Sequence, residues 1–128
     1  MASFRTVLLA ASIACAAAFG AAPAPASEPV DNCATVLGSL ATELRIARAL
    51  PPGRRTTYSC ARRYTSLVGA SRARLLRSPG APDATGEDGA WSYFFAGKLS
   101  DREPGTPELQ FRFDGDGQVA AVDCHRTG

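Results

Sequence analysis

The stretch LQFRFDGDGQVAAVDC, residues 109–124, decides the fold of this chain. In its first part Leu109, Phe111 and Phe113 alternate with polar residues, which is the pattern of an antiparallel strand buried on one face. The run Asp-Gly-Asp-Gly at 114–117 then supplies the positive backbone angles of a hairpin turn. We therefore predict two paired strands, over residues 108–113 and 118–124.

A further strand is predicted before this hairpin, over residues 90–96. Trp91, Tyr93 and Phe95 face one way along this segment, and the residues between them face the other way. A polar loop over residues 98–107 separates it from the hairpin. The pattern predicts a three-stranded antiparallel meander.

The part of the chain that precedes these strands carries helical signals. Over residues 33–50, apolar side chains recur every three or four positions, and Pro51 ends the pattern. A pair of shorter helical segments is expected within 61–78, interrupted at Gly69. Because the helices come first and the strands follow, we predict the α+β class, with N-terminal helices packed on one face of the meander.

The first 26 residues have the layout of a secretory signal peptide. An apolar run over 7–19 follows a positively charged start and leads to a segment of small residues. The run is shorter than the roughly 20 residues that a membrane-spanning helix needs, so no transmembrane helix is expected. Cleavage between Ala26 and Ser27 leaves one small domain, residues 27–128, in the periplasm or outside the cell.

Four cysteines bear on processing and stability. A lipoprotein signal would cut the chain before Cys15 and lipidate that residue, whereas cleavage after Ala26 removes it. In the second case Cys33, Cys60 and Cys124 remain in an oxidising compartment, enough for one disulfide and one further thiol. The candidate pairs are Cys60 with Cys124 and, alternatively, Cys33 with Cys60. Their spacing does not match a zinc site.

The titratable residues form no recognisable catalytic set. The single histidine, His125, is interpreted as an exposed tail residue, and it adjoins Cys124 in a strand, where neighbouring side chains point to opposite faces. The pairs Asp101/Glu103 and Glu87/Asp88 are interpreted as solvated loop charges. The acidic run at 114–117 lacks the later oxygen ligands of a calcium loop. We therefore expect no enzyme activity, no metal and no cofactor.

Charge is distributed unevenly along the chain. Residues 44–82 contain nine arginines and no acid, whereas 83–128 contain nine acids and four bases. Two explanations stay open: the two halves pair internally in a protein of biased composition, or the basic half meets an anionic partner of the cell envelope. A nucleic-acid partner is not expected, because no aromatic platform accompanies the arginines. The arginines are Arg45, Arg48, Arg54, Arg55, Arg62, Arg63, Arg72, Arg74 and Arg77.

The aromatic residues of the 90–96 strand suggest a partner surface. Trp91 and Tyr93 point to one face and Phe94 to the other, so at least one large ring lies outside the main core. Exposed aromatic and arginine side chains are common anchors for protein partners. The candidate partner surface therefore comprises Trp91, Tyr93, Phe94, Arg62 and Arg63.

Residues 67–124 resemble the small outer-membrane lipoprotein domain known as SmpA/OmlA, or BamE-like. The resemblance implies a fold of two helices on a three-stranded antiparallel sheet, an architecture shared by β-lactamase inhibitor proteins, and a role in binding other proteins without catalysis. The segments that carry the resemblance are Leu67-Val68-Gly69-Ala70-Ser71, Pro79-Gly80-Ala81-Pro82-Asp83, Trp91-Ser92-Tyr93-Phe94-Phe95, and Leu109-Gln110-Phe111-Arg112-Phe113-Asp114 with Gly117 and Val119.

Two functions are consistent with these patterns. The preferred hypothesis is a non-enzymatic, secreted or periplasmic protein-binding domain of the cell envelope. The alternative is a protein inhibitor of a secreted or periplasmic hydrolase, which would insert the loop Asp101-Arg102-Glu103 or the turn Asp114-Gly115-Asp116 into the enzyme.

Overall fold

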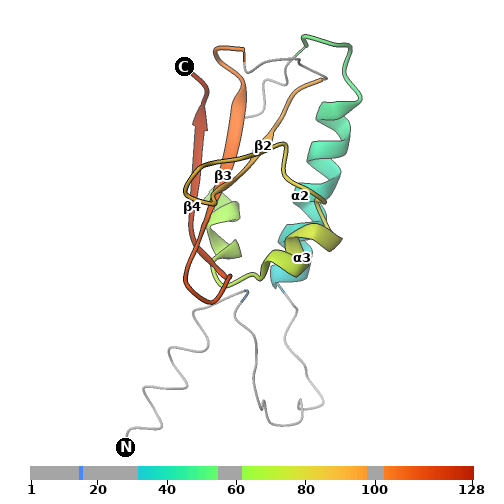
Figure 1. Cartoon of the computed structure of the whole chain (residues 1–128). Coiled ribbons are helices and arrows are strands. Elements are labelled where there is room, and N and C mark those ends of the chain that lie inside the picture. The colour runs from blue at the N-terminus through green and yellow to red at the C-terminus, as the bar shows by residue number, and fades with distance from the viewer. Residues whose placement is uncertain (1–14, 16–31, 55–61, 98–102) are drawn as a thin grey trace, which may run out of the picture.

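The computed structural model describes residue 15 and residues 32–54, 62–97 and 103–128; of Arg62 and Arg63 it describes the backbone alone (Figure 1). Within these residues no helix is both long and apolar enough to span a membrane. The elements are helix α2 (Asn32–Arg48), 3-10 helix η1 (Arg62–Leu67), helix α3 (Arg72–Arg77), and strands β1 (Ala84–Thr85), β2 (Trp91–Phe94), β3 (Pro107–Phe113) and β4 (Val119–Arg126).

Helix α2 forms where the three- and four-residue apolar periodicity predicts a helix, and it ends at Arg48, two residues before the predicted end. Its buried face consists of Cys33, Leu37, Leu40, Leu44 and Ala47. Arg45 and Arg48 occupy the last turn, where the negative end of the helix dipole favours cations.

The predicted helical pair at 61–78 consists of η1 and α3, each six residues long. Gly69 lies between them with a positive φ of 96°, a conformation that glycine adopts without strain. Ser71 caps α3, and its side chain accepts a hydrogen bond from the backbone N–H of Arg74 at 3.2 Å. The Gly80 N–H donates to the carbonyl of Leu75 and closes the other end of α3.

The helices are followed by an antiparallel sheet in the order β1-β2-β3-β4, so the α+β class is confirmed. The prediction of three strands is wrong, because Ala84 and Thr85 pair with the start of β2 as a fourth strand. Two residues are too few to produce an alternating pattern. The predicted end of the last strand at 124 is also wrong, because the pairing of β4 with β3 continues to Arg126.

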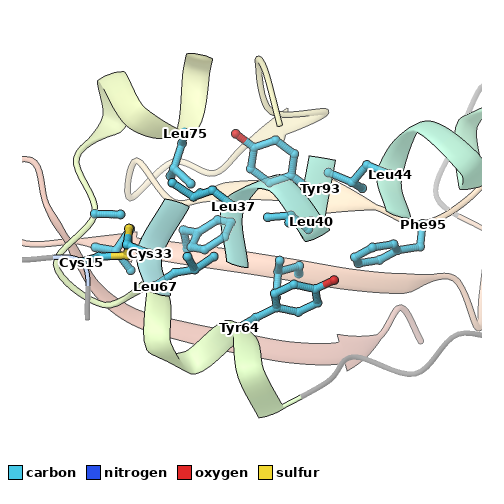
Figure 2. Close-up of a cluster of buried hydrophobic side chains, with 14 of the residues drawn as sticks. Cys15, Cys33, Leu37, Leu40, Leu44, Tyr64, Leu67, Leu75, Tyr93 and Phe95 are labelled. Atoms are coloured by element: carbon cyan, nitrogen blue, oxygen red, sulfur yellow. A yellow bond between two sulfur atoms is a disulfide. The ribbon is translucent and has the colours of Figure 1, made fainter. Parts of the chain in front are cut away.

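The core combines buried side chains of the helices with buried side chains of the sheet. Figure 2 shows Leu37, Leu40 and Leu44 of α2 gathered with the rings of Tyr93 and Phe95, and the Cys15–Cys33 disulfide at one end of the cluster. Tyr93 and Phe111 pack edge to face, with ring centroids 5.7 Å apart. The buried cluster comprises Cys15, Cys33, Leu37, Leu40, Leu44, Ala47, Tyr64, Leu67, Ala70, Leu75, Tyr93, Phe95, Leu109, Phe111 and Val119.

Backbone contacts join the helical part to the sheet at two places. Between η1 and α3, Gly69 and Ala70 exchange hydrogen bonds with Val119 at the start of β4, each at 2.8 Å. Past the end of β2, the Gly97 N–H donates to the carbonyl of Arg54 at 2.8 Å. These backbone hydrogen bonds therefore attach two segments of the helical part to the sheet.

Candidate functional site

The face of the sheet opposite the core, here called the outer face, carries a row of three neighbouring side chains that form the candidate site. Because Tyr93 and Leu109 point into the core and side chains alternate along a strand, their neighbours Phe94 and Glu108 point to the outer face. Phe94 is the register partner of Glu108, and Glu108 is the register partner of His125. Phe94, Glu108 and His125 form the outer row.

His125 lies between two carboxylates. Its Nε2 is 2.9 Å from Oε1 of Glu108, and its Nδ1 is 2.7 Å from Oδ2 of Asp123. A neutral imidazole carries one N–H, so only the imidazolium donates to both carboxylates. The Glu108 side chain is 4% exposed, and charge-assisted hydrogen bonds to such a buried carboxylate are stronger than neutral ones. The interpretation of His125 as a tail residue is wrong, because β4 extends past it.

A cavity of about 320 Å³ opens beside this cluster. Its volume is at the lower end of the range for sites that hold small molecules or a partner side chain. The wall includes the buried carboxylate of Glu108 and the exposed imidazole of His125, so an entering group meets a carboxylate and an imidazole ring. The lining residues are Pro104, Glu108, His125, Thr127 and Gly128.

Hydrogen bonds fix the backbone at the edge of the cavity. The Thr127 N–H donates to the carbonyl of Thr106 at 2.8 Å, and the Thr106 hydroxyl donates to the carbonyl of Glu103 at 2.8 Å. The Arg126 guanidinium donates to the carbonyl of Gly105 at 2.9 Å. These bonds tie the start of β3 to the end of β4 and hold the walls of the cavity in place.

The acidic residues also bear on the question of a metal site. Among the described residues, no group of three or more His, Cys, Asp or Glu side chains is arranged to hold a metal ion. The Asp114 carboxylate closes the β3–β4 turn, with Oδ1 accepting the backbone N–H groups of Asp116 at 2.8 Å and Gln118 at 3.1 Å. The turn interpretation of residues 114–117 is thus confirmed.

The predicted partner surface is divided between the core and the outer face. Tyr93 is fully buried, its hydroxyl donates to the carbonyl of Gly80 at 2.8 Å, and desolvation by burial, with a smaller contribution from Asp83, raises the pKa of its phenol. Its assignment to a partner surface is therefore wrong. Trp91 is partly exposed and packs edge to face on Phe113, with ring centroids 5.1 Å apart.

Phe94 is partly exposed on the outer face, as the alternation predicts. Its backbone N–H donates to Asp83 Oδ2 at 2.8 Å, which fixes the strand end at this ring. The side chains of Arg62 and Arg63 lie outside the described part of the chain. The prediction of a partly exposed aromatic ring is thus met at Phe94, which lies next to Asp83 and Glu108.

Internal pairing accounts for part of the positive charge. The Arg48 guanidinium forms an ion pair with Asp83 at 3.2 Å, and the Arg72 guanidinium lies over the Phe113 ring, 4.3 Å from its centroid. Within the described ranges, Arg45 and Arg77 have no ion pair. Internal contacts therefore account for Arg48 and Arg72, and an anionic partner for the other arginines stays a prediction.

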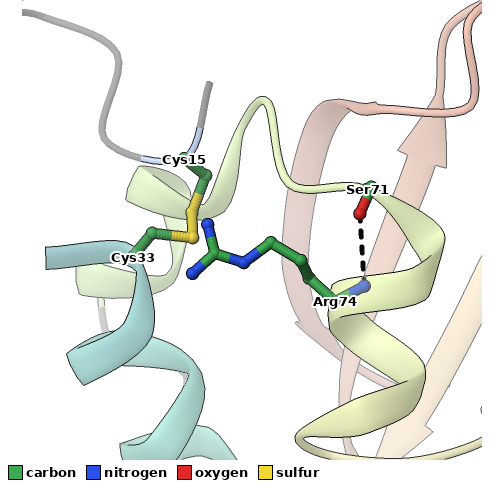
Figure 3. The surroundings of a disulfide bond; sticks show 4 residues. All are labelled: Cys15, Cys33, Ser71 and Arg74. Carbon is green, nitrogen blue, oxygen red and sulfur yellow. Dashed lines mark hydrogen bonds between the residues drawn. A yellow bond between two sulfur atoms is a disulfide. The ribbon is translucent and has the colours of Figure 1, made fainter. Parts of the chain in front are cut away.

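The disulfide in the described residues joins Cys15 to Cys33, with their Cα atoms 4.8 Å apart (Figure 3). The alternative pairing of Cys33 with Cys60 is wrong, because the sulfur of Cys33 is bonded to Cys15. Cys124 is also disulfide-bonded. The predicted Cys60–Cys124 pair stays a prediction, since Cys60 lies outside the described residues. The predicted cleavage site at Ala26 and Ser27 lies outside them too.

Sequence reasoning missed the Glu108–His125–Asp123 cluster. Glu108 and His125 lie seventeen positions apart, and the hairpin register makes them direct neighbours. The signal that could have found them was the i, i+2 spacing of Asp123 and His125 in one strand, which places both side chains on one face.

Comparison of the chain with protein-family models, with curated proteins and with solved structures finds no match. The likeness to the SmpA/OmlA domain therefore rests on the sequence motifs quoted above.

Proposed function

We propose that this protein is a non-catalytic protein-binding domain of the cell envelope, exported to the periplasm or beyond and similar in role to SmpA/OmlA-like proteins. The observation that carries the proposal is the outer row, where the partly exposed ring of Phe94 neighbours the buried carboxylate of Glu108. An aromatic anchor beside desolvated polar groups is a common centre of a protein interface.

The charges of the outer row favour a partner that brings a basic side chain. Glu108 and Asp123 supply two carboxylates around one imidazole, and of these two Glu108 lines the cavity of about 320 Å³. A partner Lys or Arg that enters the cavity would find acceptors on a preformed wall and would lose little entropy on binding.

The location in the envelope is supported by the cysteine chemistry. Disulfides persist in oxidising compartments, and the disulfide of Cys124, a residue that both processing routes retain, fits that environment. The order of helices followed by an antiparallel sheet agrees with the α+β class that the SmpA/OmlA resemblance implies, although the sheet has four strands where the resemblance implies three.

Photocrosslinking in living cells tests the proposal. A photoreactive amino acid replaces Phe94 in the full chain, and a matched variant carries it at Ile46, which is 63% exposed on α2. We expect a discrete adduct with one envelope protein from position 94 and none from position 46. Equal adducts from both positions would contradict an outer-face interface.

A substitution pair separates binding from folding. Phe94→Ala, tested without a crosslinker, should abolish co-purification of the partner that crosslinking identifies. It should change the free energy of unfolding by no more than about 1 kcal/mol, because the ring is partly exposed. Ile46→Ala should leave both quantities unchanged. Unfolding of the Phe94→Ala variant would assign this ring to packing and remove it from the proposed interface.

The hairpin turn favours hydrolase inhibition as a second candidate function. Asp114, Gly115 and Asp116 are exposed at the tip of the β3–β4 hairpin, and the bonds to Asp114 Oδ1 make that tip rigid. A rigid, exposed turn suits insertion into an active site, because little conformational entropy is lost there. Assays of secreted hydrolases with micromolar protein test it, and lack of inhibition across the panel would reject it.

A further inference from the structure

The cavity beside the outer row places a carboxylate and an imidazole nitrogen side by side. Nε2 of His125 is 2.9 Å from Oε1 of Glu108, and both residues line the cavity of about 320 Å³. The Glu108 side chain is 4% exposed, whereas that of His125 is 40% exposed. A group that enters therefore meets a desolvated carboxylate next to a ring nitrogen that can gain or lose a proton.

The other ring nitrogen has a partner outside the cavity wall. Nδ1 of His125 is 2.7 Å from Oδ2 of Asp123, which lies on the same strand and does not line the cavity. In a neutral imidazole, the hydrogen bond made by one nitrogen sets which nitrogen carries the proton. With its proton on Nδ1 and bonded to Asp123, the neutral ring of His125 presents a lone pair at Nε2.

The two protonation states of His125 give the cavity two different walls. The imidazolium donates from Nε2 to Glu108, so that carboxylate already has a cation beside it. The neutral ring instead sets a lone pair 2.9 Å from a carboxylate oxygen, and two acceptors at that distance repel each other unless a donor bonds to both. The neutral state thus favours a ligand that is a cation with several N–H groups.

Neighbouring arginines in the described part of the chain bind elsewhere. The Arg126 guanidinium donates to the carbonyl of Gly105 at 2.9 Å. On the outer face, Arg112 forms an ion pair with Asp88 at 2.9 Å. Both cations therefore have partners of their own, and the imidazolium is the cation that the described residues present to the cavity.

The acids around the His125 ring come from two strands. Glu108 of β3 and Asp123 of β4 bond to it, and the residue of β2 in the same row, Phe94, carries no charge. Glu103, on the segment that leads into β3, is exposed. With the ring protonated, the ring and its two bonded carboxylates sum to one negative charge, and with the ring neutral they sum to two. Loss of the proton therefore attracts a cation to the cluster.

We propose that the cavity binds an ammonium or guanidinium group of the partner protein in exchange for the Nε2 proton of His125. The cation donates one N–H to Oε1 of Glu108 and another to the lone pair of Nε2, while Nδ1 keeps its proton on Asp123. The displaced proton passes to solvent, so one proton leaves for each cation that binds. The inference rests on the proposed function, which supplies the cation from a partner side chain.

Such an exchange makes binding depend on pH in one direction. Histidine changes its charge between about pH 5 and 8, whereas aspartate and glutamate ordinarily titrate near about pH 4. At low pH the cation must displace a proton, and at high pH the ring is already neutral. The affinity for the cation is therefore expected to rise by about tenfold between roughly pH 5.5 and 8.

Titration of the protein, expressed as the full chain, with n-butylammonium tests the exchange. This probe carries the charged end of a lysine side chain, and nitrogen NMR of the imidazole reads its protonation. His125 is the single histidine of the sequence, so its ring signals are unambiguous. We expect the tenfold rise in affinity and, at saturation, a ring with a protonated Nδ1 and an unprotonated Nε2. Tetramethylammonium has the same charge and no N–H group, and it should bind at least about tenfold more weakly.

Three variants separate the roles of the cluster. His125→Gln removes the titrating ring, so the affinity for n-butylammonium should be equal at the two pH values. Asp123→Asn removes the carboxylate that holds the Nδ1 proton and should lower the affinity at about pH 8 by roughly threefold or more. Asp116→Asn removes the same charge at the exposed tip of the hairpin and should leave the affinity unchanged. Equal affinities in the two aspartate variants would contradict the role of Asp123.

Four results with the unsubstituted protein would overturn the inference, whether or not the variants fold. These are no binding of n-butylammonium at about pH 8, equal affinities at the two pH values, equal binding of tetramethylammonium, and a ring that stays doubly protonated in the complex. A crosslinked partner at Phe94 together with any of them would refute this inference alone. Absence of any adduct at Phe94 would refute the proposed function and, with it, the source assigned to the cation.

Discussion

Replacement of Gly97 by alanine is expected to destabilise the fold by about 2–4 kcal/mol. A Cβ atom at this position would lie 2.5 Å from the carbonyl oxygen of Pro51 and 2.7 Å from that of Leu50. These distances are roughly 0.7–0.9 Å short of ordinary contact, and both oxygens belong to the backbone. Relief of such overpacking costs about 1–3 kcal/mol. The displaced Gly97 N–H also weakens its 2.8 Å bond to Arg54, worth about 0.5–1.5 kcal/mol.

Gly38 provides the matched control. It lies inside α2, is exposed, and an added Cβ would have no atom within 4 Å. Alanine has the higher helix propensity, so Gly38→Ala should stabilise the protein by about 0.5–1 kcal/mol. The same chemical change is therefore expected to have opposite signs at the two glycines.

Urea unfolding of the oxidised protein measures the two free-energy changes, and thermal unfolding measures the melting temperatures, both followed by circular dichroism. Gly97→Ala should lower the melting temperature by roughly 10–30 °C, and Gly38→Ala should raise it by a few degrees. A Gly97→Ala variant within about 0.5 kcal/mol of the parent would show that the close approach of Gly97 to the end of α2 is absent in solution.

Further substitutions test the turn, the outer row and the core. Asp114→Ala should lower the free energy of unfolding in urea by about 1–2 kcal/mol, because two backbone N–H groups lose their acceptor. Asp116→Ala keeps both hydrogen bonds to Asp114 and should leave the free energy of unfolding almost unchanged. His125→Ala should lower the free energy of unfolding by about 1–2 kcal/mol, because it removes a hydrogen-bond donor from the buried Glu108. A decrease below about 0.3 kcal/mol would refute the contribution of this hydrogen bond to stability. Burial raises the pKa of the Tyr93 phenol, so its contribution to stability is complete below the ordinary pKa of about 10 and declines as the pH rises above it. Between about pH 9.5 and 11, the free energy of unfolding of Tyr93→Phe should therefore fall less than that of the parent. Urea unfolding at several pH values measures this, and identical slopes of unfolding free energy against pH in the two proteins would contradict the expectation.

Local patterns predicted the parts of the fold that local physics determines. The periodicity of Leu37, Leu40 and Leu44 predicted α2 because one helical face must be apolar to be buried. The hairpin of β3 and β4 was predicted because the turn at 114–117 and the flanking alternation specify the same register. Strand β1 was missed because it has two residues, too few to show an alternating pattern in the sequence. It is recognised as a strand from its pairing with β2.

The candidate site was less accessible to sequence reasoning. Alternation predicted that Phe94 points away from Tyr93, but it could not show which face the helices would cover. The partners of His125 depend on register and side-chain rotamer, and one of them, Glu108, lies on another strand. Tyr93 is buried because it packs in one cluster with the leucines of α2. The sequence alone does not show this packing, so the error in assigning the ring to the surface became visible only in the structure.

By itself the sequence determined the order of helices and strands, the β3–β4 turn, and the segregation of arginines from acids, because each depends on residues close together in the chain. The tertiary structure decided which face of the sheet became core, which carboxylates meet His125, and which cysteine meets Cys33. Those outcomes depend on the packing of the helices and on strand register, which bring distant residues within bonding distance and bury them together.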